Sequence, residues 1–237
     1  MTRRAAHPDE ALPQGEAKVR AVRDMFDAIA PRYDLVNRVM TFRMDVGWRR
    51  ATVAALALSP GSRVVDVAAG TGDLCRELER RGLRAVGVDL SGGMLAHAST
   101  GAPLAQADAL RLPVPAASVD GITCGFALRN LVDLPAFFAE AALVLRPGGR
   151  MALLEVAEPA NPVLRWGHSV YFGKVVPRIG GLLSDPAAYR YLPRSVAYLP
   201  PRPALLAQIR DAGFTAVERR PLSGGIAQLL TATRARP

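Results

Sequence analysis

The chain has 237 residues, half of them hydrophobic, which is enough for one α/β domain with a sizeable core. Lysine and arginine total 30 against 21 aspartate and glutamate, and the formal charge of +9 suits a negatively charged partner, nucleic acid or an anionic lipid surface. Two cysteines are too few for a disulfide framework, and the longest apolar windows are too short to span a membrane. These features exclude the secreted disulfide-rich and membrane-spanning classes and favour a cytoplasmic protein.

The N-terminal region divides into a tail and a helical segment. Residues 1–18 lack the apolar core of a signal peptide, so we expect a flexible tail there and a single domain over 19–237. From Val19 to Leu58 apolar residues recur at helical spacing, and Pro31 separates a first helix from a second.

Short apolar runs alternate with helical patterns through the middle of the chain. The predicted strands are Arg63–Val67, Leu83–Val88, Val119–Cys124 and Met151–Val156. The predicted helices between them are Asp73–Arg80, Gly92–Ser99 and Leu134–Leu145. This alternation favours βαβ units and a doubly wound, mostly parallel sheet of the Rossmann-like α/β class. A helix over Pro203–Ala212 and an antiparallel hairpin of Phe214–Arg219 and Gly225–Thr233 should complete the sheet.

An insertion over about 159–200 interrupts this order. Its segment Leu164–Leu183 mixes aromatic and basic side chains, which is typical of a helical lid packed on the sheet and also of a segment that contacts a lipid surface. Both interpretations can hold together. Of the three histidines only His168, in the same segment, could reach a substrate, and the sequence favours a surface role for it.

The stretch VVDVAAGTGDL predicts a cofactor site where the first strand ends. Gly70 and Gly72 permit positive φ, and the helix that follows presents free N–H groups. The dinucleotide pattern G-x-G-x-x-G is incomplete, since Cys75 stands at its third glycine, and this argues against a nicotinamide cofactor.

Acidic residues indicate a cationic cofactor. Asp66 and Asp73 place negative charge at the turn, which suits the sulfonium and ammonium groups of S-adenosylmethionine. Asp89 ends the second strand, where an acid accepts both ribose hydroxyls, and Asp108 with Ala109 should lie beside the adenine. Singly, Asp73 can instead be a helix N-cap and Asp108 a loop residue. No histidine and cysteine cluster has metal-ligand spacing, so we expect no metal.

The chain resembles the class I S-adenosylmethionine-dependent methyltransferases, and within them the C-methyltransferases of ubiquinone and menaquinone biosynthesis. The segments that carry the resemblance to the class are DVAAGTGDL, GVDLSGGML and RPGGRMALLE. Those that carry the resemblance to the family are MFDAIAPRYDLVNRVMTF with DVGWRRAT, ADALRLPVPAASVDGITCGFALRNLVD, YRYLPRSVAYLP and AGFTAVERRPLSGGIAQLLTATR. The resemblance covers roughly residues 20 to 235 and implies a seven-stranded sheet.

The resemblance implies C-methylation of a polyprenyl quinol ring. It favours the menaquinone branch, demethylmenaquinol to menaquinol, over the ubiquinone precursor 2-polyprenyl-6-methoxy-1,4-benzoquinol. It also implies peripheral contact with the inner face of the cell membrane and no nucleic-acid partner. A homodimer is left open. By position, the family's cofactor contacts fall on Thr71, Asp89, Asp108 and Ala109. Ala69 replaces a usual glycine, and Gly125 replaces a usual serine, so a contact from that serine is missing.

The candidate catalytic residues are Arg129, Asn130, Tyr33 and Asp108. Arg129 and Asn130 can donate hydrogen bonds to a developing phenolate, and the proton leaves through water or Asp108 because arginine is a poor base. Alternatively, Arg129 forms an internal salt bridge with Asp133 or Asp120, and Tyr33 only packs while Asp34 caps a helix.

Three rival functions use the same turn. A methyltransferase acting on RNA or another small molecule, a nicotinamide-dependent oxidoreductase and a nonenzymatic binder each need a cofactor-type turn. The sequence offers no dedicated RNA-recognition module.

Overall fold

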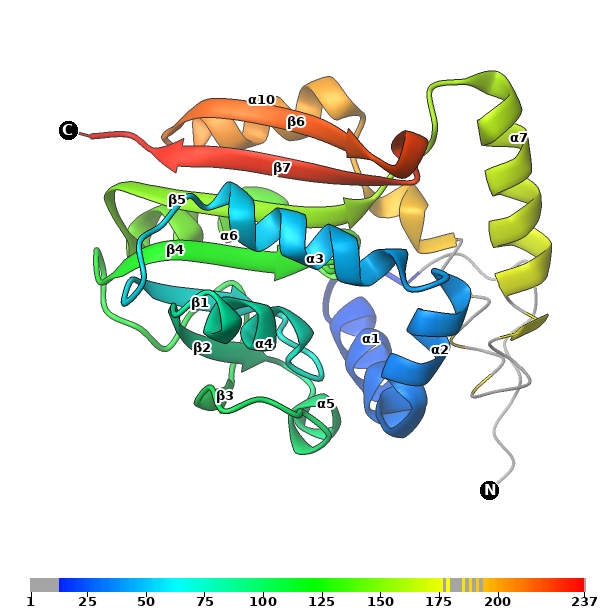
Figure 1. The fold of residues 1–237 in the computed structure, drawn as a ribbon, viewed down its shortest axis with the longest axis horizontal. Coiled ribbons are helices and arrows are strands. Elements are labelled where there is room, and N and C mark those ends of the chain that lie inside the picture. Colours follow the sequence, from blue (N-terminus) through cyan, green and yellow to red (C-terminus); the bar gives the residue numbers. More distant parts are fainter. Residues whose placement is uncertain are drawn as a thin grey trace.

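A seven-stranded mixed sheet forms the centre of the computed structural model, which describes residues 13–176, 178–179, 185, 188, 191 and 194–236 (Figure 1). The strand order is β3-β2-β1-β4-β5-β7-β6, and β7 alone runs antiparallel to its neighbours. The strands are β1 (Arg63–Val67), β2 (Arg84–Asp89), β3 (Leu104–Gln106), β4 (Val119–Gly125), β5 (Leu145–Val156), β6 (Phe214–Leu222) and β7 (Ala227–Arg234). The predicted doubly wound, mostly parallel sheet is confirmed, and so is its C-terminal hairpin.

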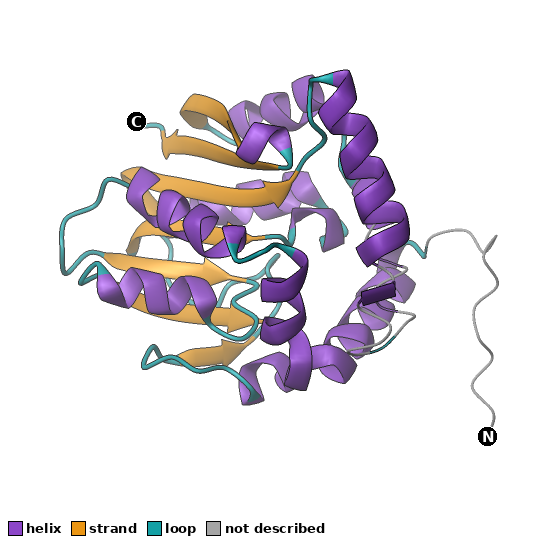
Figure 2. Cartoon of the chain, turned by 45° about the vertical axis from the view of Figure 1, so that its right-hand side comes forward, coloured by secondary structure: helices purple, strands orange, loops and turns teal. Residues whose placement is uncertain are grey.

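Helices cover both faces of the sheet and the end toward which the parallel strands point (Figures 1 and 2). The α-helices that lie wholly within the described residues are α1 (Gly15–Ile29), α2 (Tyr33–Met40), α3 (Met44–Ala55), α4 (Asp73–Arg80), α5 (Gly92–Ala96), α6 (Leu134–Val144), α7 (Pro162–Val170) and α10 (Arg202–Asp211). In both views α1, α2 and α7 lie beyond the carboxyl ends of β4 and β5. They therefore enclose the edge where an open α/β sheet binds its ligands.

Strand β1 shows how the sequence builds two cores. Its side chains alternate, so Val64 packs with α3 and α4 on one face, whereas Val65 and Val67 pack with α6 and α10 on the other. All three valines are at most 1% exposed. A strand buried on both faces reads as a continuous apolar run, and this is why the run around Asp66 predicted a central strand.

Helix α1 begins inside the segment expected to be a flexible tail. Residues 1–12 lie outside the described residues, but Gly15–Lys18 form the first turn of α1. Lys18 is buried: its Nζ donates to the Leu131 carbonyl at 2.9 Å and lies 3.7 Å from the centre of the Tyr198 ring. The boundary at residue 18 is therefore wrong, because a contact distant in sequence, which periodicity does not register, holds this turn.

The segment Val19–Leu58 contains one break more than predicted. Pro31 lies in a 3-10 turn between α1 and α2, as expected. A second break separates α2 from α3, where Phe42 and Arg43 adopt φ of 50° and 62°. The Thr41 hydroxyl donates to Asp45 at 2.7 Å across this turn. Neither glycine nor proline lies at the break, so the sequence contained no residue that predicts the end of a helix there.

The insertion after β5 begins with helix α7, which lies beyond the carboxyl end of that strand (Figure 1). Asn161 caps α7 by accepting N–H bonds from Val163 and Leu164, and the helix continues as a wider turn over Tyr171–Val175. Part of the expected lid, including residues 180–184, lies outside the described residues. Among the helices that the structure does describe, none is long and apolar enough to cross a membrane.

Candidate active site

The glycine turn after β1 opens onto a cavity. Gly70 and Gly72 have φ of 56° and 82°. A Cβ on Gly72, the N-cap of α4, would lie 2.9 Å from Thr100 Cγ2, so this glycine serves close packing. A Cβ on Gly70 would meet nothing within 4 Å. The backbone at Gly70 is thus accessible to a ligand.

A smaller cavity of about 120 Å³ lies at this turn. It brings together residues predicted at the ends of separate strands and Tyr33 of α2. Those predicted residues are Tyr33, Gly70, Asp89, Asp108, Ala109 and Asn130. Its lining from α1 comprises Val19, Val22 and Phe26. Asp89 of β2 and Asp108 of the loop after β3 therefore lie close to the glycine turn, as expected for side chains at the carboxyl ends of neighbouring strands.

Asp89 connects β2 to the glycine turn. Its Oδ2 accepts the Gly70 N–H at 2.7 Å, and its Oδ1 accepts the Ser91 N–H at 2.8 Å. Burial raises the pKa of Asp89, and these two N–H bonds oppose that shift. A carboxylate has about four lone-pair sites, so roughly two remain for ribose hydroxyls. Asp108 similarly accepts the Leu110 N–H at 2.9 Å and still lines the cavity.

Three other residues assigned to the cofactor lie outside both main cavities. Asp66 is 1% exposed and accepts hydrogen bonds from Thr123 at 2.7 Å and from Cys75 at 3.5 Å. Burial is the main cause that raises the pKa of Asp66 to about 7. Thr71 donates its hydroxyl to Asp34 at 2.5 Å, and Gly72 packs as described above. The structure thus places Asp66 beneath the turn, among the residues that support it.

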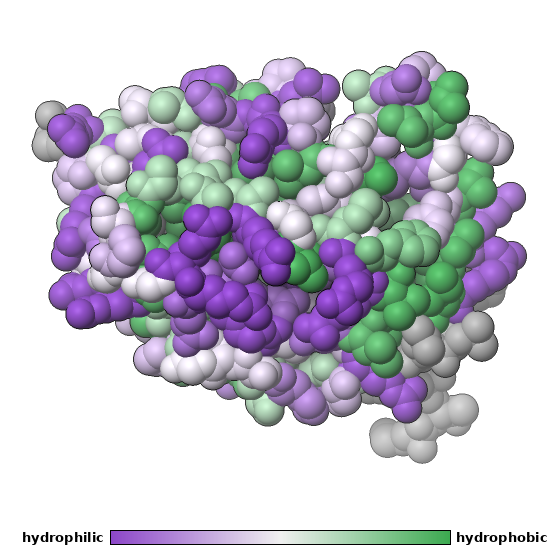
Figure 3. Space-filling view, viewed as in Figure 1, coloured by the Kyte–Doolittle hydropathy of each residue, from purple (hydrophilic) through white to green (hydrophobic). Residues whose placement is uncertain are grey.

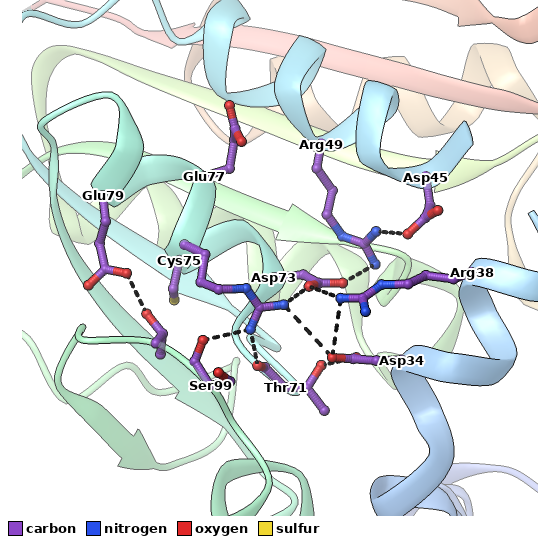
Figure 4. Close-up of polar contacts among 12 residues, drawn as sticks. Asp34, Arg38, Asp45, Arg49, Thr71, Asp73, Cys75, Glu77, Glu79 and Ser99 are labelled. Carbon is purple, nitrogen blue, oxygen red and sulfur yellow. Dashed lines mark hydrogen bonds and ion pairs between the residues drawn. The ribbon is translucent and has the colours of Figure 1, made fainter. Parts of the chain in front are cut away.

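Ion pairs attach the N-terminal helices to the turn (Figure 4). Asp73 pairs with Arg49 at 3.0 Å, with Arg38 at 3.8 Å and with Arg76. Asp73 is therefore not the N-cap, a position that Gly72 holds. Asp34 bonds to Thr71 and makes no cap for α2, so that alternative is also wrong. Asp73, which was expected to face the cofactor, therefore neutralises arginines instead.

A larger cavity of about 380 Å³ lies beside the first. Most of its wall is apolar or aromatic, including Trp48, Leu164, Tyr171, Phe172 and Ile226. Tyr33 and Phe126 line both cavities, so the two spaces meet at these residues.

Phe126 holds an unusual backbone conformation at this junction. Its φ is 58°, a region that bulky residues rarely adopt. The ring contacts Trp48 edge-on at 6.1 Å between centroids, with the Arg49 guanidinium 5.9 Å away. Strain of this kind concentrates at functional sites. Nothing in the sequence singled out Phe126.

Arg129 lies buried in the wall of the larger cavity. Its Nη1 lies 2.5 Å from Glu155 Oε1 and donates to the Phe126 carbonyl at 2.7 Å, while Nε donates to Ser195 at 3.1 Å. The internal salt bridge is real, but its partner is Glu155. The partners we weighed are engaged elsewhere: Asp133 caps α6 and Asp120 pairs with Arg146. Glu155 lies one residue before the end of the apolar strand β5, so its place in the sequence resembles that of Asp89 at the end of β2.

The predicted catalytic residues divide between the two cavities. Arg129 lines the larger one, Asn130 and Asp108 line the smaller one, and Tyr33 reaches both. Asn130 Oδ1 accepts a hydrogen bond from the Tyr191 hydroxyl at 3.1 Å. Since Asp108 does not line the cavity that Arg129 lines, the structure does not bring them together as a proton relay.

His168 lines the larger cavity and so lies where a substrate can reach it. In the described part of the chain, no group of three or more histidine, cysteine, aspartate or glutamate side chains is arranged to hold a metal ion.

Curated relatives match nearly the whole chain. The demethylmenaquinone methyltransferase of Deinococcus radiodurans is 47% identical over 89% of this chain and 91% of its own. The ubiquinone/menaquinone biosynthesis C-methyltransferase UbiE of Syntrophotalea carbinolica is 42% identical over 91% of this chain and 94% of its own.

Solved structures share the fold at low identity. The cyclase SpnF has a TM-score of 0.64 at 17% identity, covering 96% of this chain and 98% of its own. Phosphoethanolamine N-methyltransferase 2 of Haemonchus contortus, in complex with S-adenosylhomocysteine, has a TM-score of 0.59 at 15% identity over 79% and 52%. A cyclase and an N-methyltransferase on one fold mean that the fold alone does not fix the reaction. The model of the ubiE/COQ5 methyltransferase family matches residues 14–234, so the chain belongs to that family.

Proposed function

We propose that the protein transfers a methyl group from S-adenosylmethionine to a ring carbon of demethylmenaquinol, giving menaquinol. The observation that carries this proposal is the meeting of two unlike cavities at Tyr33 and Phe126. One is lined by acids and a glycine turn, and the other is apolar with a buried arginine. Relatives named for quinone methylation, at up to 47% identity, support the choice of acceptor.

The smaller cavity fits the cofactor's nucleoside part. Asp89 retains lone pairs for the ribose, Gly70 leaves its backbone open, and Asp108 with Ala109 forms the adjoining wall. Its volume of about 120 Å³ is below the roughly 300–1,000 Å³ of small-molecule sites. The cofactor therefore extends beyond this cavity toward the larger one, which it meets at Tyr33 and Phe126.

The larger cavity supplies what the acceptor ring needs. When bound, S-adenosylmethionine supplies an electrophilic methyl group, so the protein must orient the ring carbon and increase its electron density. Arg129 is held rigid by Glu155, and the structure gives its Nη2 no partner among the described residues. We assign Nη2 to the developing phenolate oxygen. The phenolic proton leaves to a water molecule because Asp108 lies in the other cavity.

Tyr33 and Asn130 have supporting roles in this proposal. Tyr33 lies where the cavities meet, and burial raises its pKa, so it remains a neutral hydroxyl that can orient the ring. Asn130 and Phe126 both line the smaller cavity, so Asn130 can position the cofactor beside the Phe126 ring.

We further propose that the acceptor arrives from an anionic membrane surface. Exposed apolar side chains of α2, the turn after it and α7 form what we call the docking face: Leu35, Val39, Phe42, Val163, Leu164 and Trp166. Figure 3 shows hydrophobic side chains gathered on this side of the molecule. Phe42, Val163 and Leu164 also line the larger cavity, so the face is continuous with its mouth. Exposed Arg43 and Lys174 and the charge of +9 complement anionic lipid.

A direct comparison of acceptors tests the proposed function. The purified protein should methylate demethylmenaquinol with a higher kcat/KM than 2-polyprenyl-6-methoxy-1,4-benzoquinol, under anaerobic conditions that keep both rings reduced. The reverse preference would assign the chain to the ubiquinone branch, and turnover of neither ring would refute quinol methylation. A homodimer stays a prediction, which sedimentation of the same preparation tests.

A further inference from the structure

His168 presents an unused polar atom to the larger cavity. The residue lies on α7, and its ring lines the cavity and packs on Phe172 with centroids 4.8 Å apart. Its Nε2 is buried and has no hydrogen-bond partner among the described residues. Buried polar atoms are paired in the great majority of cases, so an unpaired one in a cavity wall calls for a ligand or a water molecule.

Other polar side chains of this wall already have partners within the protein. Asp45 accepts from the Thr41 hydroxyl at 2.7 Å and pairs with Arg49. The Ser223 hydroxyl accepts the Trp48 indole N–H at 2.8 Å. Arg129 is held by three bonds, and only its Nη2 lacks an acceptor in the described part of the chain. His168 Nε2 and Arg129 Nη2 thus remain available to a ligand, beside the Tyr33 hydroxyl at the junction of the cavities.

The environment keeps His168 neutral. Burial lowers its pKa, and the Glu158 carboxylate only partly opposes that shift. The other charged or titratable groups around the cavity are Arg49, Arg129, Asp45, Tyr33 and Tyr171. A neutral imidazole carries one N–H donor and one acceptor nitrogen. With the proton on Nδ1, the tautomer that we assign here, Nε2 is an acceptor that can take a hydrogen bond from a hydroxyl but not from a carbonyl.

We propose that His168 accepts a hydrogen bond from the second ring hydroxyl of the quinol, across the ring from Arg129, and so selects the reduced ring over the oxidised one. This inference rests on the proposed function, because it takes the acceptor to be a para-dihydroxy ring. One atom is an acceptor and the other a donor, which matches in chemistry one ring hydroxyl and one developing phenolate oxygen. The oxidised quinone offers two carbonyl acceptors, of which only the one at Arg129 is matched.

Binding of one short-chain demethylated 1,4-naphthoquinone, in its oxidised form and in its anaerobically reduced form, tests the inference. Dissociation constants are measured with S-adenosylhomocysteine present, so no turnover occurs. His168→Phe keeps the stacking on Phe172 and removes both nitrogens, and His168→Gln keeps an acceptor. His97→Phe is the matched control, because His97 is an exposed histidine on α5's C-terminal end, away from both cavities.

We expect His168→Phe to weaken binding of the reduced ring by about 3- to 10-fold and of the oxidised ring by less than about 2-fold. His168→Gln should restore most of the difference, and His97→Phe should change neither constant. Equal losses for both rings, or no loss for the reduced ring, would overturn the assignment to His168 while leaving quinol methylation intact. If the unmodified protein binds neither ring, the proposed function fails and this inference fails with it.

Discussion

Arg129 and Glu155 form an ion pair whose Nη1 and Oε1 atoms lie 2.5 Å apart, with both side chains almost wholly buried. Arg129 follows β4, and Glu155 lies near the end of β5, the neighbouring parallel strand. The pair therefore spans two strand ends and fixes a guanidinium in the wall of the larger cavity. A buried charge without its partner is strongly destabilising, so the pair has a structural role whatever its chemical one.

A double-mutant cycle separates the two roles of Arg129. Arg129→Gln and Glu155→Gln should each lower the free energy of unfolding by about 3 kcal/mol, and the double variant should lose less than the sum. Turnover should fall by about 100-fold or more in both variants that lack Arg129. Denaturant unfolding and single-turnover rates provide the measurements. Recovery of turnover in the double variant would mean that Arg129 is only structural.

Asp89→Ala should weaken S-adenosylmethionine binding by about 10-fold or more. The variant removes the acceptors proposed for the ribose and also the acceptor of the Gly70 N–H. Calorimetry measures the effect, and Asp120→Asn serves as the control because Asp120 pairs with Arg146 outside both cavities. Unchanged affinity of the Asp89→Ala variant for S-adenosylmethionine would contradict the assignment of the smaller cavity as the cofactor site.

The docking face can be followed through one of the two tryptophans. Trp166 is 72% exposed and Trp48 is 6% exposed, so vesicles containing phosphatidylglycerol should shift Trp166 emission to shorter wavelength. Phe42→Ser should weaken vesicle binding by about 10-fold, and salt should weaken it further. Leu143→Ser, at a 54% exposed position on α6, is the matched control. Equal effects of Phe42→Ser and Leu143→Ser would contradict a defined face.

Asp66 should make stability depend on pH. Its folded pKa of about 7 lies above the ordinary value of 3.8, so the folded state binds the extra proton between these values. Its contribution is fully present below about pH 4 and is lost as pH rises through 7, by up to about 4 kcal/mol. Asp66→Asn should flatten this slope in denaturant unfolding, while Asp120→Asn should not. If the stability of Asp66→Asn depends on pH as steeply as that of the unmodified protein, the titrating group is a residue other than Asp66.

Features that repeat along the chain were predictable. Strand β1 and its glycine turn follow from a continuous apolar run and two small residues, and Asp89 follows from its place at a strand end. The same reasoning would have found Glu155, an acid ending the apolar run of β5. Structural features that depend on local or periodic contacts can therefore be predicted from the sequence.

Features that depend on distant contacts were not predictable. Lys18 is held by Leu131 and Tyr198, more than 100 residues away, so it was assigned to a tail. Phe126 and Phe42 adopt positive φ without being glycine, and nothing local marks them. Asp66 shares its strand with Val64 and Val65, and its side-chain direction, inward against Cys75, decides that it does not line the cavity.

The position of the transferred methyl group tests the central claim most directly. The protein is incubated anaerobically with methyl-labelled S-adenosylmethionine and demethylmenaquinol, and the product is fragmented in a mass spectrometer. We predict label on the ring carbon, with S-adenosylhomocysteine formed in equal amount. Label on a ring oxygen, or none on the quinol while the cofactor binds, would contradict C-methylation.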